Sequence, residues 1–382
     1  MHSAENQYLE VYEPHSMSLN RRQFLSHRAP LLALAGSAAL AIAACTPTVE
    51  EKNTALQWRM RTSWQKDMPG LFEAAERLAK RINHSCTGRL KVTVQAAESS
   101  QEAFGVFDEV ASGRCEMAHS GAQFWAGKSL ATTFFSSLPF GMTAGESTSW
   151  LLAGEGWALW RELYAKFGLA PFPAGNTGAQ MAGWFKRELK SLRGVKGLKL
   201  RLTGLAAEVW RRIGGEVVAL DGASLVKALE DGSIDAAEWM GPWNDLALGL
   251  HRGARNYYYP GWQEPSAALE CIVNLRALNA LPEDLQTAIE SACLASHAEE
   301  TALMTARNQQ ALLTLVSVHK INVLRLPTDV ITALSRASEA VCSDLAERDQ
   351  FARRVFDSAM AFREQARQWQ QVGDQAFVTA RG

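Results

Sequence analysis

The sequence predicts an α/β protein with two hinge-linked lobes, each built around a parallel or mixed central sheet, followed by C-terminal helices. Strands and helices alternate between residues 58 and 119, and the same order of elements returns between residues 198 and 239. Once an N-terminal export segment is set aside, roughly 330 residues remain. That is more than one hydrophobic core usually spans, so two lobes are expected.

The first unit opens with a strand. Residues 58–64 and 90–94 alternate apolar and polar side chains as strands do, whereas residues 70–83 repeat apolar side chains at helical spacing. A helix through Phe104 ends at Gly113, just before a short strand. Strand-helix-strand units of this kind form parallel sheets.

The second unit repeats this order about a hundred residues later. Its predicted elements are strands and helices in strict alternation: 198–202, 205–213, 216–220, 223–231 and 234–239. The segments FDEVASGRCEMAHS and LVKALEDGSIDAAEW, one from each unit, both run from a helix through a glycine to a short strand.

Ligands of open parallel sheets lie beyond the carboxyl ends of the strands. Residues 119–125 of the first unit and 238–243 of the second unit occupy those ends. We therefore expect a binding site between these two segments.

The chain becomes strongly helical after Pro282, with a strand at 322–326 and a long helical stretch from Thr328 almost to the end. A modest apolar stripe marks its last part, at Phe351, Val355, Ala359 and Phe362. Such a stripe needs a partner. We favour packing on the chain's own lobes over packing on a second subunit.

The predicted boundaries follow from these patterns. Lobe 1 is 55–173, completed by part of 265–300, and lobe 2 is 174–264, completed by part of 301–340. The C-terminal segment 341–382 is a candidate dimerisation element.

The N-terminal 45 residues have the form of an export signal. A twin-arginine motif, Arg21-Arg22, precedes an uncharged apolar run from Ala29 to Ala44, which is short for a membrane span. The run ends in a sequence like a lipobox, which leaves two outcomes open: peptidase cleavage, or lipid attachment at Cys45. Translation starts at either Met1 or Met17.

Composition excludes several classes of partner and site. The 39 basic and 40 acidic residues are balanced, so neither nucleic acid nor a membrane surface is an expected partner. The remaining cysteines have no CxxC spacing and indicate neither a zinc site nor a dense disulfide framework: Cys86, Cys115, Cys271, Cys293 and Cys342.

The most specific text lies within residues 174–264. It reads AGNTGAQMAGWFKREL, GLKLRLTGLAAEVWRRIGG, SIDAAEWMGPWNDLALG and NYYYPGWQEP, in that order. Together with SGAQFWAGK in the first unit, these segments resemble the solute-binding proteins of TRAP transporters, in particular the branch that binds 2-oxo acids, often with a metal ion. The resemblance implies a periplasmic-binding-protein-like fold and a periplasmic receptor that delivers a small organic acid to the TRAP membrane subunits.

The resemblance assigns the ligand carboxylate to Arg201, in the GLKLRL strand. A guanidinium suits this role because its parallel donors match a carboxylate and it stays charged. The competing interpretation is an ion pair on the surface or between strands.

The resemblance also implies a metal site made of Gln180, Glu238, Glu264 and the backbone carbonyl of Trp239. An all-oxygen set suits a hard cation, Na⁺ or Ca²⁺. The competing interpretation is that Glu238 pairs with Arg201 and no metal binds.

This chain departs from that branch after the short strand at 115–119. Where the branch commonly has tyrosines, it has Gln123, Phe124 and Trp125. The amide of Gln123 would replace a tyrosine hydroxyl that contacts the ligand, or that contact would be lost. The ring of Phe124 or Trp125 would form a wall of the pocket. The identity of the acid is therefore left open, with a bulkier or more apolar one as a candidate. The expected ligand contacts are Arg201, Gln180, Gln123, Phe124, Trp125 and Trp239.

Two other functions are compatible with parts of this sequence. An exported metal-dependent hydrolase would use Glu238, Glu264 or His119 as its base, but no GxSxG or HExxH motif supports it. A ligand-binding sensor for a different organic acid would share the whole site. We expect a receptor and not an enzyme.

Overall fold

The computed structural model describes residues 55–66 and 68–382, and the structural statements below concern those residues. The export segment 1–45, with Cys45 and both candidate start residues, lies outside them. Within the described residues, no helix combines the length and apolarity needed to cross a membrane.

The first sheet is mixed, with strands in the order β2-β1-β3-β10-β4. Its members are β1 (Leu56–Thr62), β2 (Leu90–Gln95), β3 (Met117–Ser120), β4 (Leu169–Asn176) and β10 (Ala268–Asn274). β1 runs parallel to β2 and β3, whereas β10 runs antiparallel to β3 and β4. The parallel part is the unit that the sequence predicts.

Two amphipathic helices connect the parallel strands, α1 (Leu71–Ser85) and α2 (Ser100–Ala111). The apolar face of α1 is buried through Leu78 and Ile82. The Ser99 side chain caps α2 by accepting a hydrogen bond from the Glu102 N–H. Each helix therefore begins and ends close to where helical spacing and local capping predict.

The second sheet is also mixed, in the order β11-β9-β5-β8-β6-β7. Its strands are β5 (Gly183–Phe185), β6 (Lys199–Arg201), β7 (Glu216–Val218), β8 (Ala236–Ala237), β9 (Asn256–Tyr259) and β11 (Asn322–Arg325). The helices among them are α6 (Gly204–Arg212), α7 (Gly222–Asp231) and α8 (Pro242–Leu248). β6 is parallel to both β7 and β8, whereas β5 is antiparallel to β8 and β9.

β8 is shorter than the strand predicted at 234–239. Only Ala236 and Ala237 pair in the sheet, and Glu238 and Trp239 leave it. The chain then turns into α8, whose N-terminal Pro242 begins the helix. Glu238 and Trp239, both predicted site residues, thus lie in a loop at the end of a strand.

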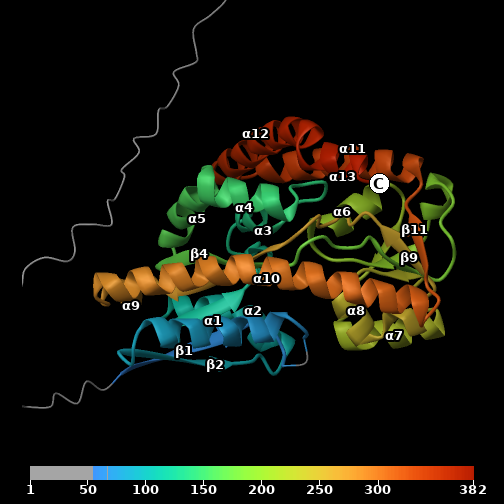
Figure 1. The fold of residues 1–382 in the computed structure, drawn as a ribbon. Helices are drawn as coiled ribbons and strands as arrows, with labels where there is room; N and C mark the ends of the chain where they lie inside the picture. The colour runs from blue at the N-terminus through green and yellow to red at the C-terminus, as the bar shows by residue number, and fades with distance from the viewer. Residues whose placement is uncertain (1–54, 67) are drawn as a thin grey trace, which may run out of the picture. The chain divides into compact units, whose positions relative to one another are not determined.

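The chain passes between the sheets three times: after β4, after β9 and along α10 (Glu283–Ser317). This helix of 35 residues contacts α1 and β4 on the side of the first sheet and α8 on the side of the second. Figure 1 shows α10 running past both sets of elements. It is a shared support for the two sheets.

The other helices are divided between the two sheets. They are η1 (Ala122–Trp125), α3 (Thr132–Ser136), α4 (Ala144–Ala153), α5 (Gly156–Ala165), η2 (Leu192–Val195), η3 (Leu250–Arg252), α9 (Leu275–Asn279), α11 (Thr328–Ala346), α12 (Gln350–Val372) and α13 (Asp374–Ala380). η3 contacts α7 and α8, and α11 contacts α6, whereas α5 contacts β4 and α3 contacts β10.

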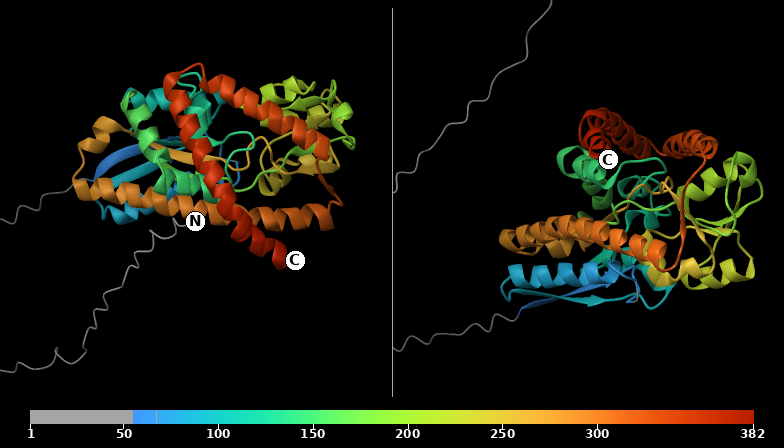
Figure 2. Two further views of the ribbon diagram at one scale, coloured as in Figure 1. Left: turned by 90° about the horizontal axis from the view of Figure 1, so that it is seen from above. Right: turned by 45° about the vertical axis from the view of Figure 1, so that its right-hand side comes forward.

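The apolar stripe of α12 packs on its own chain. Val355 and Ala359 are fully buried, and the Phe356 ring lies 5.5 Å from that of Phe134 on α3. α12 also contacts α4 and α5. The preferred interpretation of this stripe is confirmed. Beyond it, the end of the chain projects away from the other elements (Figure 2).

Candidate functional site

Arg201 ends β6, and its side chain is held by the two neighbouring strand ends. Its Nε donates to the carbonyl of Leu220, after β7, at 3.1 Å, and its Nη1 donates to the carbonyl of Glu238, after β8, at 2.8 Å. The Glu238 N–H in turn donates to the Arg201 carbonyl at 3.1 Å. Arg201 is 8% exposed. Its hydrogen bonds within the described residues use Nε and Nη1 and leave Nη2 available to a ligand.

Glu238 and Glu264 place two carboxylates in the same region. Arg201 Nη1 lies 3.6 Å from Glu238 Oε2. The ion pair between these two residues, which was the competing interpretation of Glu238, therefore does form. Burial raises the pKa of Glu238 well above its ordinary range; nearby Arg201 opposes this shift, and the charge of Glu264 adds to it. Burial also raises the pKa of Glu264. One arginine does not fully neutralise two interacting carboxylates, so the arrangement favours an added cation.

Gln180 joins this group through Glu264. Its Nε2 donates to Glu264 Oε2 at 3.2 Å and to Thr177 Oγ1 at 3.1 Å. Its other amide atom, Oε1, is buried and accepts no hydrogen bond from the described residues. A buried oxygen without a donor is costly unless a ligand or cation satisfies it.

Gln263 is a member that sequence reasoning missed. Its Nε2 donates to the Met181 carbonyl at 2.7 Å and to Glu238 Oε1 at 3.3 Å, while its Oε1 is buried without a donor among the described residues. Its position directly before Glu264, in a PGWQEP segment already singled out, was the available signal.

These residues fit a hard cation. Glu238, Glu264 and Gln180 supply carboxylate and amide oxygens, and two buried amide oxygens still lack a donor. No group of three or more His, Cys, Asp or Glu side chains suited to a metal occurs in the described part of the chain.

Gly261 brings the Gln180 and Glu264 segments together. A Cβ built on Gly261 would lie 2.4 Å from the Gln180 carbonyl oxygen. Two backbone segments approach here with no room for a side chain, which explains why glycine stands at this position.

Trp239 places its ring beside the arginine. The Arg201 guanidinium carbon lies 5.2 Å from the ring centroid, a cation–π distance. A Cβ on Gly222 would meet this ring at 2.7 Å. The ring is thus wedged between Arg201 and the start of α7.

The segment 123–125 lies on the first sheet, in η1, and its side chains diverge. Phe124 is partly exposed and meets Trp64 and Phe104 edge-on at 5.8 and 5.3 Å. Trp125 is buried, packs on Phe107 and donates its indole N–H to Glu270. Gln123 is partly buried. Within the described residues, no hydrogen bond or ion pair joins this segment to Arg201, Gln180, Glu238 or Glu264.

His119 is enclosed by structural partners. Its Nδ1 accepts from Trp64 Nε1 at 2.8 Å, and its Nε2 lies 3.3 Å from the Ala174 carbonyl. Burial lowers its pKa to about 4. A neutral, fully buried imidazole with both nitrogens engaged is a structural group and is poorly placed to act as a base.

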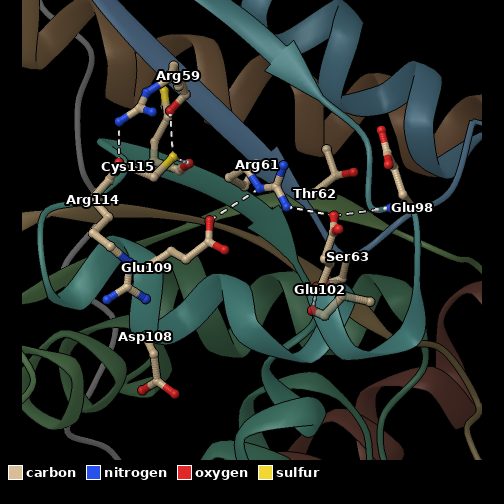
Figure 3. Close-up of polar contacts among 12 residues, drawn as sticks. Arg59, Arg61, Thr62, Ser63, Glu98, Glu102, Asp108, Glu109, Arg114 and Cys115 are labelled. Carbon is tan, nitrogen blue, oxygen red and sulfur yellow. Dashed lines mark hydrogen bonds and ion pairs between the residues drawn. The ribbon is translucent and has the colours of Figure 1, made fainter.

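A cavity of about 630 Å³ lies at the carboxyl ends of β1 and β2, lined by Arg61, Gln65, Lys66, Val94, Gln95, Ala96, Ala97 and Glu98. None of the predicted site residues lines it. Figure 3 shows Arg61 between Glu102 and Glu109, at 2.9 and 3.2 Å. The arginine that lines this cavity is thus already paired with two carboxylates, in contrast to Arg201.

A family model described as bacterial extracellular solute-binding protein, family 7, matches residues 62–349. The chain belongs to this family. The resemblance inferred from residues 174–264 is therefore confirmed.

One curated relative and two solved structures are similar over most of their length. The monocarboxylate 2-oxoacid-binding periplasmic protein of a Nostoc species is 37% identical over 363 residues, which is 94% of this chain and 98% of the relative. A TRAP periplasmic solute-binding protein from Pseudoalteromonas atlantica, with bound sodium and pyruvate, is 36% identical with a TM-score of 0.80 and covers 85% of this chain and 99% of its own.

The second structure is a TRAP transporter solute-binding protein from Bordetella bronchiseptica, 32% identical with a TM-score of 0.80, covering 85% of this chain and 97% of its own. It is described as a mixed-occupancy dimer with calcium and picolinate in one site and an apo second site. These findings confirm the α/β fold with two mixed sheets. They also confirm an extracytoplasmic solute receptor in place of an enzyme.

Proposed function

We propose that this receptor binds a 2-oxo monocarboxylate of the size of pyruvate, together with Na⁺ or Ca²⁺, and delivers it to TRAP membrane subunits. One observation carries the proposal: a braced arginine lies beside two carboxylates and two amide oxygens that lack donors. The relatives' sodium, calcium, pyruvate and picolinate support the same chemistry.

Arg201 would bind the ligand carboxylate through its available Nη2 edge. Gln180, Glu238, Glu264 and the Trp239 carbonyl would hold the cation, and the newly identified Gln263 would support them. The cation offsets the repulsion between the two carboxylates and attracts the oxygens of the acid. Without it, the anionic solute would face two negative groups.

The first sheet would close the opposite side of the solute. Phe124 is the better wall residue of the segment 123–125, because Trp125 faces the core. Gln123 would offer an amide. Closure would occur as a hinge motion between a lobe of residues 55–173 with part of 265–300 and a lobe of 174–264 with part of 301–340.

Export would follow the twin-arginine route directed by residues 20–44, followed either by signal-peptidase cleavage or by lipid attachment at Cys45. Support comes from five cysteines, all buried and free: Cys86, Cys115, Cys271, Cys293 and Cys342. A chain that folds before export keeps these thiols away from periplasmic oxidants. Cell fractionation tests this: the chain should accumulate in the cytoplasm when Arg21 and Arg22 are both changed to Lys, and unchanged export would contradict it.

The deciding experiment is a thermal-shift screen of the purified protein against 2-oxo, 2-hydroxy and dicarboxylic acids. It is run with calcium, with sodium after chelation, and in potassium buffer after chelation. A bound acid raises the melting temperature, and the cation requirement identifies the ion.

The matched variant is Arg201→Ala, with exposed Arg211→Ala as control. We expect Arg201→Ala to abolish the shift and Arg211→Ala to keep it. If no acid shifts the wild type, or if Arg201→Ala keeps the full shift, the proposed function is wrong.

A further inference from the structure

Asp245 lies in the first turns of α8 and is almost completely buried. Its Oδ2 accepts two hydrogen bonds of 2.8 Å, from the indole N–H of Trp184 and from the hydroxyl of Tyr257. These two residues face each other across β5 and β9, and their rings stack with centroids 4.0 Å apart. The carboxylate is therefore fixed on a rigid aromatic pair.

The second oxygen of Asp245 reaches towards the site. Oδ1 accepts a hydrogen bond from the Met240 N–H at 3.1 Å. That N–H belongs to the same peptide unit as the carbonyl of Trp239. The unit is planar and trans, so a fixed N–H direction also fixes the opposite direction of the carbonyl.

The next peptide is tied as well. The Met240 carbonyl accepts from the Met181 N–H at 3.0 Å, and Met181 follows Gln180. Met240 thus links the segment that carries Glu238 and Trp239 to the segment that carries Gln180. Both ends of this link are main-chain groups, so the identity of the Met240 side chain matters little to it.

We propose that Asp245 is a positioning residue for the cation site: through the Met240 N–H it directs the Trp239 carbonyl and keeps Glu238 and Gln180 in register. This inference rests on the proposed function. Outer partners of metal ligands commonly fix ligand orientation in this way. A carboxylate that accepts from the N–H also polarises the peptide and increases the negative charge on its carbonyl oxygen.

Only a carboxylate satisfies all three donors. An asparagine has one acceptor oxygen and one NH₂ group. With its oxygen towards Trp184 and Tyr257, its NH₂ would face the Met240 N–H, and two donors would oppose each other. Asp245→Asn therefore breaks the link to the site while changing the side-chain volume very little.

The test compares Asp245→Asn with Tyr257→Phe by titrating calcium into each protein, with and without pyruvate, by calorimetry. Both variants lose contacts around Asp245, but Tyr257→Phe keeps the bond to Met240. We expect Asp245→Asn to weaken calcium binding roughly 10- to 100-fold. Tyr257→Phe should stay near wild type even where its melting temperature falls as far.

Equal affinity of Asp245→Asn and wild type would overturn the inference, as would an equal loss in both variants. If the wild type binds calcium and pyruvate normally in that case, the proposed function stands and only the positioning role fails. If the wild type binds neither calcium nor sodium, the cation part of the proposed function fails and the positioning role fails with it.

Should Asp245→Asn not fold, hydrogen exchange on the wild type decides. The Met240 amide, which donates a hydrogen bond to Asp245, should exchange slowly in the calcium-free protein and more slowly still when calcium is bound. An amide that exchanges freely, or that calcium leaves unchanged, would contradict the role.

Discussion

Glu270 is a buried carboxyl group on β10 that lies apart from the proposed site. It accepts hydrogen bonds from the indole of Trp125 and from the hydroxyl of Tyr164 at 2.9 Å. Burial raises its pKa from 4.5 to about 7, although both hydrogen bonds oppose the shift. Between about pH 4.5 and pH 7, the Glu270 carboxyl group is therefore mostly protonated in the folded chain and mostly ionised in the unfolded chain.

This shift predicts a specific pH dependence. A raised carboxyl pKa contributes stability that is present below about pH 4.5 and is lost as the pH rises through about 7. Glu270→Gln, which cannot titrate, should lose less stability than wild type between pH 5 and pH 8. The difference should approach about 3 kcal/mol at most.

Urea unfolding of both proteins at several pH values measures it. Groups common to the two chains cancel in the difference, including the buried His119. Parallel stability curves for wild type and variant would show that Glu270 titrates normally.

Residue types at the site were predictable from sequence, but side-chain directions were not. Arg201, Glu238, Glu264 and Gln180 do gather, because strand ends of one sheet meet at one edge. Phe124 and Trp125 are adjacent in sequence, yet Phe124 is partly exposed whereas Trp125 is buried in the core. The sequence alone does not show which of the two aromatic side chains is buried. Contacts made through the backbone, such as that between Asp245 and Met240, leave no sequence pattern.

At the scale of elements, sequence reasoning missed four strands: β4 and β10 of the first sheet, and β5 and β9 of the second. β4 carries Pro171 and Pro173, which normally argue against a strand. It forms an edge of the first sheet, where a missing N–H is tolerated. Its partner β10 comes about a hundred residues later, so their pairing could not be inferred. The two predicted units, whose parallel strands are close in sequence, were recovered.

The close approach at Gly261 gives a second prediction. In Gly261→Ala the new methyl would meet the Gln180 carbonyl oxygen, and neither backbone can easily yield. We expect a loss of about 1–3 kcal/mol in unfolding free energy and weaker cation binding, because Gln180 is displaced.

Gly105→Ala is the matched control. Gly105 lies in α2 with nothing within 4 Å of its Cβ position, so alanine should be neutral or stabilising. Thermal unfolding and calcium titration measure both variants. A Gly261→Ala protein with wild-type stability would mean that the two segments have room to separate.

At the scale of the whole molecule, the end of the chain exposes large apolar side chains. Trp369, Val372, Phe377 and Val378 are 66%, 75%, 67% and 51% exposed. We propose that these residues of α12 and α13 form a homodimer contact, because exposed apolar patches of this kind mark interaction surfaces. Unlike the stripe around Val355, they are left exposed by the described part of the chain.

Removing residues 368–382 should therefore convert a dimer into a monomer while acid binding persists. Light scattering coupled to gel filtration reports the mass, and the thermal shift reports binding. Leu313→Glu, which alters an equally exposed apolar residue on α10, serves as a control and should leave the dimer intact. A wild type that is monomeric at micromolar concentration would rule out the contact.

The bracing of Arg201 has an evolutionary consequence. Its guanidinium is held by the carbonyls of Leu220 and Glu238, which any side chains at those positions would supply. The proposed acid anchor and cation ligands all lie at the second sheet, whereas Gln123 and Phe124 lie at the first. Substitutions at the first sheet can then change which acid is preferred while Arg201 and the cation ligands remain intact. Related receptors can therefore evolve new ligand specificities through changes in one sheet only.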